Sequence, residues 1–375
     1  MKVIIDDKIP FIKGALEPYA DVKYMAGNII TNETLKDTDA LIIRTRTKCN
    51  ATLLENTKVK FIASATIGYD HIDTEYCNKN EIKWINAPGC NSGSVMQYVA
   101  SAILHYAYQK NISLKDRVIG VVGIGNVGKK IVRLAEIFGM QVLLNDPPRA
   151  RKEGNCGFIS LDGILREADI ISFHVPLILE GEDKTYHLAD KIFFDKINPG
   201  TLFINTSRGE VVDTVALKKV LTEDKLSGVI LDVWENEPGI DIDLLQKLLI
   251  GTPHIAGYSA DGKANGTKMV VQEFSNYYGL GLDDWEPEDI PPADDSVIFY
   301  DGKNKTFQEI ISELILHTYP IQDEKEWLLQ DPTKFEDYRG NYPLRREFSA
   351  YTVKVTNISE EDKNKIRRLG FYIEE

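Results

Sequence analysis

The sequence has no long apolar segment and few cysteines and histidines. No stretch approaches the roughly eighteen consecutive apolar residues that a membrane-spanning helix needs, so we expect no membrane partner. There are four cysteines, without a C-x-x-C pair or a histidine at metal-binding spacing. We therefore expect free thiols and no metal site. The cysteines are Cys49, Cys77, Cys90 and Cys156.

Basic residues are also in deficit. The chain has 44 Lys and Arg against 57 Asp and Glu, a formal net charge of -13. Phosphate backbones repel such a surface unless a basic face is segregated, so we expect no nucleic-acid partner, and an anionic substrate needs a local basic pocket. The opening Met1–Asp6 resembles a strand and lacks the apolar run and cleavage site of a secretory signal. We expect a cytoplasmic protein.

Length and apolar pattern predict an α/β protein with more than one domain. At 375 residues the chain exceeds what one core ordinarily supports. Short apolar runs alternate with polar, helix-like stretches in residues 1–95, which is typical of a parallel sheet. The expected strands are Val3–Ile5, Ala40–Ile43, Phe61–Ala65 and Ile82–Ile85. We predict a substrate-binding domain over 1–95, to which a helix in 259–280 returns.

A second series predicts a doubly wound nucleotide-binding domain over residues 96–258. A helix over Ser92–Tyr108 leads into it. Near-continuous apolar strands and right-handed crossovers favour a parallel sheet covered on both faces. Its expected strands are Val118–Val122, Gln141–Asn145, Ile170–His174, Thr201–Asn205 and Ser227–Asp232. After an acidic, Pro-bearing linker, residues 281–375 predict a small α+β domain with a helix over Phe307–His317 and a strand over Tyr351–Val355.

A glycine-rich turn after the strand Val118–Val122 predicts a dinucleotide site. In the pattern G-x-G-x-x-G it runs Gly123, Ile124, Gly125, Asn126, Val127 and Gly128. The glycines allow a tight turn, backbone approach to a pyrophosphate and close helix packing. About twenty residues further on, Asp146 ends the next strand, where a carboxylate bonds the ribose hydroxyls and repels the extra phosphate of NADP. NAD is the expected cofactor. Arg149 and Arg151 weaken this preference only slightly, since solvated arginines are the simpler interpretation.

Three later segments, each after a predicted strand, bring an Arg, a Glu and a His to the sheet edge where ligands bind. They are N-T-S-R-G-E-V-V-D from Asn205, D-V-W-E-N-E-P from Asp232 and T-P-H-I-A-G from Thr252. Arg208 suits holding a carboxylate, His254 proton transfer, and Glu237 stabilising an imidazolium. Singly, each has a plain alternative: a surface arginine, a helix-start glutamate or a packed histidine. The other histidines lack a carboxylate at recognisable spacing, and we expect structural or surface roles for His71, His105, His174, His187 and His317.

Together these motifs resemble the D-isomer-specific 2-hydroxyacid dehydrogenase family. They occur in the family's order over roughly residues 1–280. The resemblance implies an NAD-dependent oxidoreductase whose Rossmann domain is inserted into a flavodoxin-like substrate domain, with Arg208, Glu237 and His254 as catalytic residues. Beyond the glycine turn and Asp146, it implies cofactor contacts from Val175, Thr206, Ser207, Arg208, Asp232 and Gly257.

Within the family the chain is most similar to a branch that oxidises 4-phospho-D-erythronate at C2, to 2-oxo-3-hydroxy-4-phosphobutanoate, in pyridoxal phosphate (vitamin B6) biosynthesis. The segments D-P-P-R-A from Asp146 and A-T-I-G-Y-D-H-I-D from Ala65 carry this similarity, with a C-terminal extension that implies a homodimer. The implied substrate contacts are Thr45, where a serine is expected, Thr66 and Tyr258. Arg44 and Arg46, at i and i+2 on a strand end, point to one face and suit a phosphate.

Three alternatives stay open. One is a family member acting on 3-phosphoglycerate or an unphosphorylated hydroxy acid, for which Arg44 and Arg46 are an exposed basic pair. Another is a non-catalytic NAD sensor on the same fold, against which the three catalytic residues argue. The third is a scaffold whose C-terminal domain recruits other proteins.

Overall fold

The structure is a computed structural model that describes residues 1–154 and 157–374, so Cys156 lies outside the described residues. The chain forms two compact units, one of residues 1–91 and 259–292 and the other of residues 92–258 and 293–375. Cys49 and Cys77 are buried free thiols, and Cys90 is also buried. Among the described residues, no helix is both long and apolar enough to cross a membrane.

The first unit is built on a five-stranded sheet in the order β2-β1-β3-β4-β5. All its pairings are parallel, and this order is the flavodoxin-like one. The strands are β1 (Lys2–Asp6), β2 (Asp21–Met25), β3 (Ala40–Ile43), β4 (Phe61–Ser64) and β5 (Lys83–Ile85). Only β2 escaped prediction, because it lies at the sheet edge and exposes Asp21 and Lys23.

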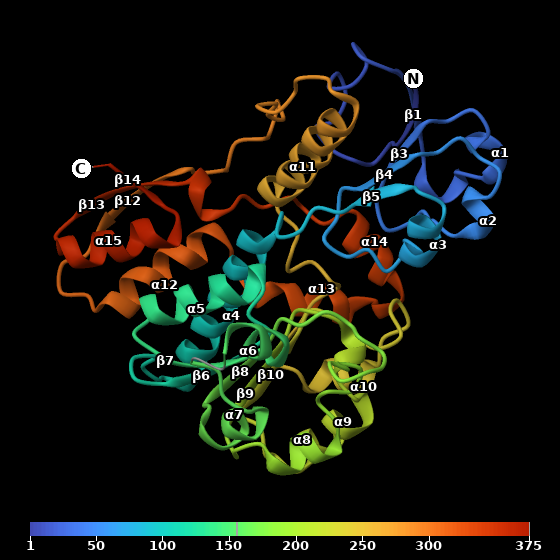
Figure 1. The fold of residues 1–375 in the computed structure, drawn as a ribbon. Helices are drawn as coiled ribbons and strands as arrows, with labels where there is room; N and C mark the ends of the chain where they lie inside the picture. The colour runs from blue at the N-terminus through green and yellow to red at the C-terminus, as the bar shows by residue number, and fades with distance from the viewer. Residues whose placement is uncertain (155–156, 375) are drawn as a thin grey trace. The chain divides into compact units, whose positions relative to one another are not determined.

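Helices from two distant parts of the chain cover this sheet. Three short ones are α1 (Asn32–Leu35), α2 (Ala51–Leu54) and α3 (Thr74–Lys79). The long α11 (Ala260–Tyr278) starts at Ser259, whose side chain accepts a hydrogen bond from the Gly262 amide, and ends at Gly279 with a left-handed φ of +68°. Its Val270, Val271 and Phe274 pack in one core with strand residues such as Ile5, Ile42 and Phe61. Figure 1 shows α11 (orange) beside the blue strands.

The second unit holds a six-stranded parallel sheet in the order β11-β10-β9-β8-β6-β7. Its strands are β6 (Val118–Val122), β7 (Gln141–Asn145), β8 (Ile170–Phe173), β9 (Leu202–Asn205), β10 (Gly228–Leu231) and β11 (Ile250–Gly251). The first five agree with the predicted strands, and the two-residue β11 was missed. β6 lies between β7 and β8, so the chain continues on one side of β6 and then on the other. The carboxyl end of β6 is therefore a switch point, the place where α/β sheets bind ligands.

Helices flank this sheet on both faces. They are α4 (Ser92–Lys110), α5 (Asn126–Ile137), α6 (Pro147–Glu153), α7 (Leu161–Glu167), α8 (Lys191–Lys196), α9 (Thr214–Thr222) and α10 (Ile242–Lys247). The long α4 is buried along most of its length, because it contacts both α5 and a helix of the C-terminal segment, α12 (Phe307–Thr318). Single 3-10 turns lie at Gly27–Ile29, Gly209–Val211, Ile321–Asp323, Pro332–Lys334 and Phe348–Ala350.

The C-terminal domain, residues 293–375, has its own three-stranded parallel sheet in the order β12-β13-β14. Its strands are β12 (Val297–Asp301), β13 (Thr352–Thr356) and β14 (Tyr372–Glu374), and its further helices are α13 (Glu324–Gln330), α14 (Phe335–Gly340) and α15 (Glu360–Leu369). The expected α12 and β13 are present; the apolar strand β12, the strongly polar α15 and the three-residue β14 were not predicted. This domain (red in Figure 1) shares one hydrophobic core with α4 and α5.

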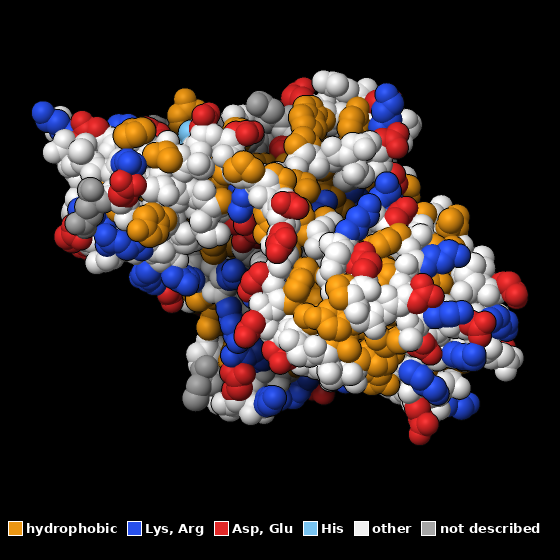
Figure 2. Space-filling model, turned by 90° about the horizontal axis from the view of Figure 1, so that it is seen from above, with side chains coloured by type: hydrophobic (Ala, Val, Ile, Leu, Met, Phe, Trp, Pro, Cys, Tyr) orange, Lys and Arg blue, Asp and Glu red, His pale blue; other side chains and the backbone are white. Residues whose placement is uncertain are grey.

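The excess negative charge is spread rather than gathered on the face seen in Figure 2. There, Lys and Arg side chains lie between Asp and Glu side chains over most of the surface, with apolar patches among them.

Candidate active site

The glycine turn after β6 has the geometry of a dinucleotide cradle. Gly123 has a φ of +89°, and a Cβ there would lie 2.6 Å from the carbonyl oxygen of His174. A Cβ on Gly128 would overlap the carbonyl of Gly123, so α5 starts in close contact with the turn. A Cβ on Gly125 meets nothing within 4 Å, which leaves open space at the N-terminus of α5. A pyrophosphate fits such a space beside uncapped helix N–H groups.

Asp146 closes the other side of this cradle. It is half-buried, and its Oδ2 accepts a 2.8 Å hydrogen bond from the Ile124 amide inside the turn. Its Oδ1 accepts from the Arg149 amide at 3.1 Å and so caps α6. Arg149 itself pairs with Glu153 at 2.7 Å, and Arg151 pairs with Asp183 at 2.6 Å. Both guanidiniums already bind carboxylates, so this end of the site fits NAD.

Val175 and the turn Thr206–Arg208 follow β8 and β9 at the same sheet edge. Val175 approaches the glycine turn, since a Cβ on Gly123 would lie 2.8 Å from its side chain. Ser207 donates its hydroxyl to Asn205 at 2.7 Å, and Asn205 donates in turn to the Arg208 carbonyl at 2.8 Å. Gly209 leaves no room for a side chain, because a Cβ there would overlap the backbone of Trp234. The Arg208 turn is thereby locked onto the loop that carries Glu237.

A buried carboxylate organises the loop that carries His254. Asp232 is 1% exposed, and it accepts hydrogen bonds from the amides of Ile255 at 2.6 Å and Ala256 at 2.9 Å. The Thr252 hydroxyl donates to it at 2.7 Å. Burial raises the pKa of Asp232, and these hydrogen bonds act against that rise. His254 has a φ of +57°, a strained backbone that the surrounding bonds must hold.

Glu237 and His254 form a hydrogen-bonded pair. The Nδ1 of His254 lies 2.8 Å from the Oε2 of Glu237, and the side chains are 27% and 20% exposed. The other oxygen of Glu237 accepts from the Trp234 amide at 2.9 Å. Burial acts to raise the pKa of Glu237, but the bond to His254 and the nearby positive charge outweigh it and leave the pKa lowered. Glu237 is thus an anion that orients the imidazole and leaves its Nε2 for proton transfer.

A second histidine–glutamate pair involves His187, for which the sequence showed no carboxylate at recognisable spacing. His187 Nε2 lies 2.7 Å from the Oε1 of Glu235, and the other oxygen of Glu235 accepts from the Thr214 amide at 2.9 Å. The residues are 48 positions apart, so no motif spacing revealed them. Burial lowers the pKa of a third histidine, His174, to about 3, so this ring beside Thr206 is neutral.

The first unit carries a cluster of cations at the end of β3. Arg44 lies 3.4 Å from the fully buried Asp6. Lys263, on the first turn of α11, was not predicted; burial, and then the charge of Arg44, lowers its pKa to about 8. The reason given for pairing Arg44 with Arg46 is wrong, because β3 ends at Ile43 and residues 44–47 form a turn without strand alternation. Arg46 is exposed and its Cβ lies near Gly27.

The remaining predicted substrate residues are placed as follows. Thr45 is exposed in the turn between Arg44 and Arg46. Thr66 is half-buried just after β4, where its hydroxyl bonds Ser64 at 2.7 Å and the Gly68 carbonyl at 3.0 Å. In the second unit, Gly257 and Tyr258 directly follow the His254 loop, and Tyr258 is half-buried. Arg208, Glu237, His254 and Tyr258 therefore share one unit, and Arg44 and Thr66 share the other.

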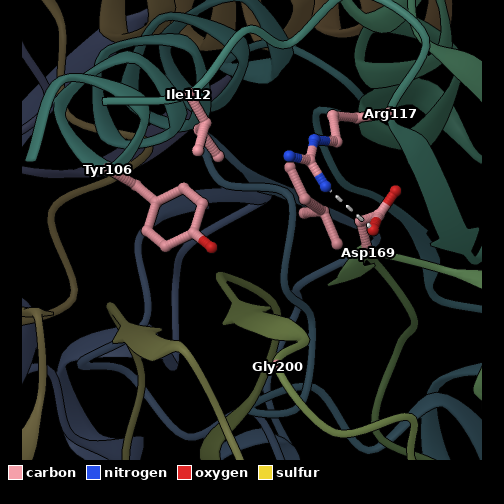
Figure 3. A pocket seen from close by; sticks show the side chains of 6 residues that line it. Tyr106, Ile112, Arg117, Asp169 and Gly200 are labelled. Carbon is pink, nitrogen blue, oxygen red and sulfur yellow. Dashed lines mark hydrogen bonds and ion pairs between the residues drawn. The ribbon is translucent and has the colours of Figure 1, made fainter. Parts of the chain in front are cut away.

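The small pocket drawn in Figure 3 lies away from these loops. It has a volume of about 30 Å³, room for about one water molecule. Its lining residues precede strands: Arg117 stands before β6, Asp169 before β8 and Gly200 before β9. The Arg117–Asp169 pair, at 3.4 Å, faces into it. This is the amino edge of the sheet, opposite the ligand-binding edge. Within residues 1–154 and 157–374, no group of three or more His, Cys, Asp or Glu has metal-binding geometry.

Comparison with known proteins gives matches over the whole chain. Residues 97–256 match the model of the D-isomer specific 2-hydroxyacid dehydrogenase, NAD binding domain, and residues 295–370 match a domain of unknown function (DUF3410). The erythronate-4-phosphate dehydrogenase of Bacteroides thetaiotaomicron is 52% identical over 94% of this chain and 99% of its own. That of Porphyromonas gingivalis is 39% identical over 97% of this chain and 98% of its own.

Solved structures agree with the fold. D-lactate dehydrogenase from Aquifex aeolicus, complexed with NAD and lactic acid, has a TM-score of 0.63 at 27% identity and covers 76% of this chain and 97% of its own. The NAD-bound 3-phosphoglycerate dehydrogenase of Entamoeba histolytica has a TM-score of 0.64 at 23% identity, covering 78% of this chain and 99% of its own. The second speaks for the fold alone.

Proposed function

Because the chain belongs to the D-isomer specific 2-hydroxyacid dehydrogenase family and, within it, to the erythronate-4-phosphate dehydrogenases, we propose that its substrate is 4-phospho-D-erythronate. The reaction is the oxidation of C2 to give 2-oxo-3-hydroxy-4-phosphobutanoate, a step toward pyridoxal phosphate. The enzyme is an NAD-dependent dehydrogenase. Both 3-phosphoglycerate and a sensor role remain as outcomes of the test.

The observation that carries the proposal is the Glu237–His254 pair at 2.8 Å, on loops at the ligand-binding edge of the sheet, with the Arg208 turn packed against the loop of Glu237. Oxidation of a hydroxy acid requires a base for the hydroxyl proton, and His254 Nε2 is the candidate, with Glu237 stabilising the imidazolium that results. Arg208, permanently charged and locked by the Gly209 contact, holds the substrate carboxylate. When bound, NAD supplies the hydride acceptor. The glycine turn, Asp146, Val175, Thr206, Ser207, Asp232 and Gly257 form its binding site.

We place the substrate phosphate at Arg44, Arg46 and Lys263, with Thr45, Thr66 and Tyr258 as further substrate contacts. Arg44 and Lys263 interact electrostatically, and their mutual repulsion is relieved by an anion. Lys263→Met removes one cation from this cluster and leaves Arg44 in place. It is expected to raise KM for the phosphorylated acid and leave KM for NAD unchanged.

The C-terminal domain is proposed to form a homodimer through the outer face of its sheet. Val297, Phe299 and Tyr372 on this face are 45%, 77% and 65% exposed, while Ile298, Val353 and Ile373 face the core. Three exposed large apolar side chains on the two outer strands of one three-stranded sheet are typical of a protein interface. Light scattering is expected to give a dimer for the native protein and a monomer for Phe299→Glu. Tyr108→Glu, at an 84% exposed apolar residue on α4, is the control and stays dimeric.

The cytoplasm is the proposed location. Two buried free thiols, Cys49 and Cys77, fit a reducing compartment, in which disulfides are rare.

The test of the function is NADH formation by the purified protein. NAD is supplied with 4-phospho-D-erythronate, 3-phosphoglycerate or unphosphorylated erythronate, and a 2-oxo acid acceptor relieves product inhibition. A clear preference for the first acid is expected. A preference for 3-phosphoglycerate would contradict the substrate, and NAD binding without turnover of any acid would favour the sensor.

A further inference from the structure

The loop that carries His254 contacts a segment of the C-terminal domain that lies about ninety residues later in the chain. This segment runs between α14 and the 3-10 turn Phe348–Ala350 and contains Arg345. The Nη1 of Arg345 donates to the carbonyl oxygen of Ile255 at 3.2 Å, and its Nη2 donates to that of Ala256 at 2.6 Å. The guanidinium therefore binds the two residues that directly follow His254.

The same two residues are held from their other side by Asp232. Its carboxylate accepts from the amides of Ile255 and Ala256, at 2.6 and 2.9 Å. The N–H groups of Ile255 and Ala256 thus bond to the Asp232 carboxylate, and their C=O groups bond to the Arg345 guanidinium. Both kinds of charged hydrogen bond are stronger than neutral ones. This double clamp fixes the backbone immediately after His254, whose own φ is +57°.

Arg345 is itself anchored to α4 by its remaining donors. Its Nε donates to the Oε1 of Gln97 at 3.0 Å, and Nη2 also lies 3.2 Å from the carbonyl of Ser94. The guanidinium stacks 4.3 Å from the ring centre of Tyr319. Four acceptors and an aromatic face suit the planar arginine fork, and a lysine ammonium cannot reproduce these contacts.

The surrounding residues hold this segment in place. Gln97 donates to the carbonyl of Arg346 at 2.9 Å, and Ser94 donates to Glu347 at 2.8 Å. Gly93 has no side chain where the Glu347 carboxylate passes, and a Cβ there would overlap it. Further along, Arg339 on α14 lies over the ring of Tyr258 at 5.9 Å and interacts electrostatically with Glu237. The C-terminal domain thus reaches the backbone that directly follows His254 and acts electrostatically on Glu237.

We propose that the C-terminal domain is a working part of the active site, and that Arg345 is the positioning residue through which it holds His254. This rests on the proposed function for His254 and adds to it a second role for a domain otherwise assigned to dimer formation. Arg345 touches neither reacting group, so its effect passes through the backbone of Ile255 and Ala256.

The experiment compares Arg345→Met and Arg345→Lys in the full-length enzyme. Arg368→Gln is the control, at a side chain of α15 that is 50% exposed. Arg345→Met is expected to lower kcat for 4-phospho-D-erythronate on the order of 100-fold, the loss that small displacements of a catalytic group cause. KM for NAD stays unchanged, and Arg345→Lys falls between Arg345→Met and the native enzyme. Arg368→Gln behaves as native.

A purely structural role would lower Tm and leave kcat of the folded enzyme unchanged, and that result would overturn the proposal. If Arg345→Met does not fold, Arg345→Lys decides by the same criterion. Amide hydrogen exchange of the segment 252–258 gives a readout that needs no substrate: faster exchange in the Arg345 variants than in Arg368→Gln is expected. Unchanged exchange would contradict the clamp, whether or not the enzyme acts on this acid. Inactivity of the native enzyme on this acid would refute only the proposed function.

Discussion

Two histidine–glutamate pairs lie in the second unit, and they differ less in geometry than in surroundings. The pairs are His254–Glu237 at 2.8 Å and His187–Glu235 at 2.7 Å, with similar exposure. In each, the second carboxylate oxygen accepts from a backbone amide. The pairs differ in the contacts of their loops. The two residues that follow His254 are held by Asp232 and Arg345. His187 instead stacks on Tyr186, with ring centres 4.0 Å apart, and Glu235 bonds the first residue of α9. A short His–carboxylate distance alone therefore does not identify a catalytic pair.

The largest expected difference between the pairs is in turnover after loss of the imidazole. His254→Ala is expected to lower kcat by about 10²–10⁴-fold, the usual contribution of general acid–base catalysis. His187→Ala is the matched control and should retain most of the native kcat. Steady-state kinetics with NAD and 4-phospho-D-erythronate give the comparison, and equal losses in both variants would remove the distinction.

Replacing the two glutamates should give a smaller contrast. Glu237→Gln keeps a hydrogen-bonding side chain but loses the charge that stabilises the imidazolium, so we expect kcat to fall on the order of 10- to 100-fold. Glu235→Gln should leave kcat unchanged. A comparable fall of kcat in Glu235→Gln would show that the second pair also controls proton transfer.

For stability we expect the opposite order, with the larger effect at the His187–Glu235 pair. Glu235 joins His187 to the start of α9, so Glu235→Gln should destabilise the fold by about 1 kcal/mol, the net worth of a hydrogen bond. His254→Ala keeps the Cβ, and so the left-handed backbone, and it frees no helix start; it should change Tm less than Glu235→Gln does. Thermal unfolding of the two variants measures this. A larger loss of Tm in His254→Ala would contradict the structural role given to the His187–Glu235 pair.

The smallest effect is the pH dependence of that stability. Burial acts to raise the pKa of Glu235, but hydrogen bonds from His187 and Thr214 outweigh it, and the pKa is lowered. A lowered carboxyl pKa contributes stability above the unfolded pKa of about 4.3, and this is lost as the pH falls through the folded value. The Tm difference between the native protein and Glu235→Gln should therefore hold from neutral pH down to about pH 5 and shrink as the pH falls further, through about 4.3 toward the folded pKa. A constant difference would mean that charge contributes nothing.

The sequence predicted the parts of the fold that local pattern determines. Strands with continuous apolar runs, such as β6 and β9, matched closely, because a buried parallel strand is apolar on both faces. The edge strand β2 and the two-residue β11 did not, since their state depends on the neighbouring strand and not on their own residues. In the C-terminal domain, α15 is mostly charged and buries only Ile366 and Leu369.

The predictions of site residues divide in the same way, between residues in local motifs and residues without one. The glycine turn, Asp146 and the Glu237–His254 pair were predicted because each lies in a motif at a strand end. Lys263 and Arg345 were missed, because each reaches its partner from a segment remote in the chain and has no motif of its own. Arg44 and Arg46 were expected to alternate on a strand end, but the strand ends at Ile43, before either arginine.

The most direct test of the central claim, that His254 and Glu237 act as one proton-transfer unit, is a double-mutant cycle on kcat/KM. The measurement compares His254→Ala, Glu237→Gln and the double variant with 4-phospho-D-erythronate and NAD. Residues that act as a unit are not additive, so the double variant should be about as slow as His254→Ala alone. Losses that multiply would show that Glu237 acts independently of His254 and would contradict the account.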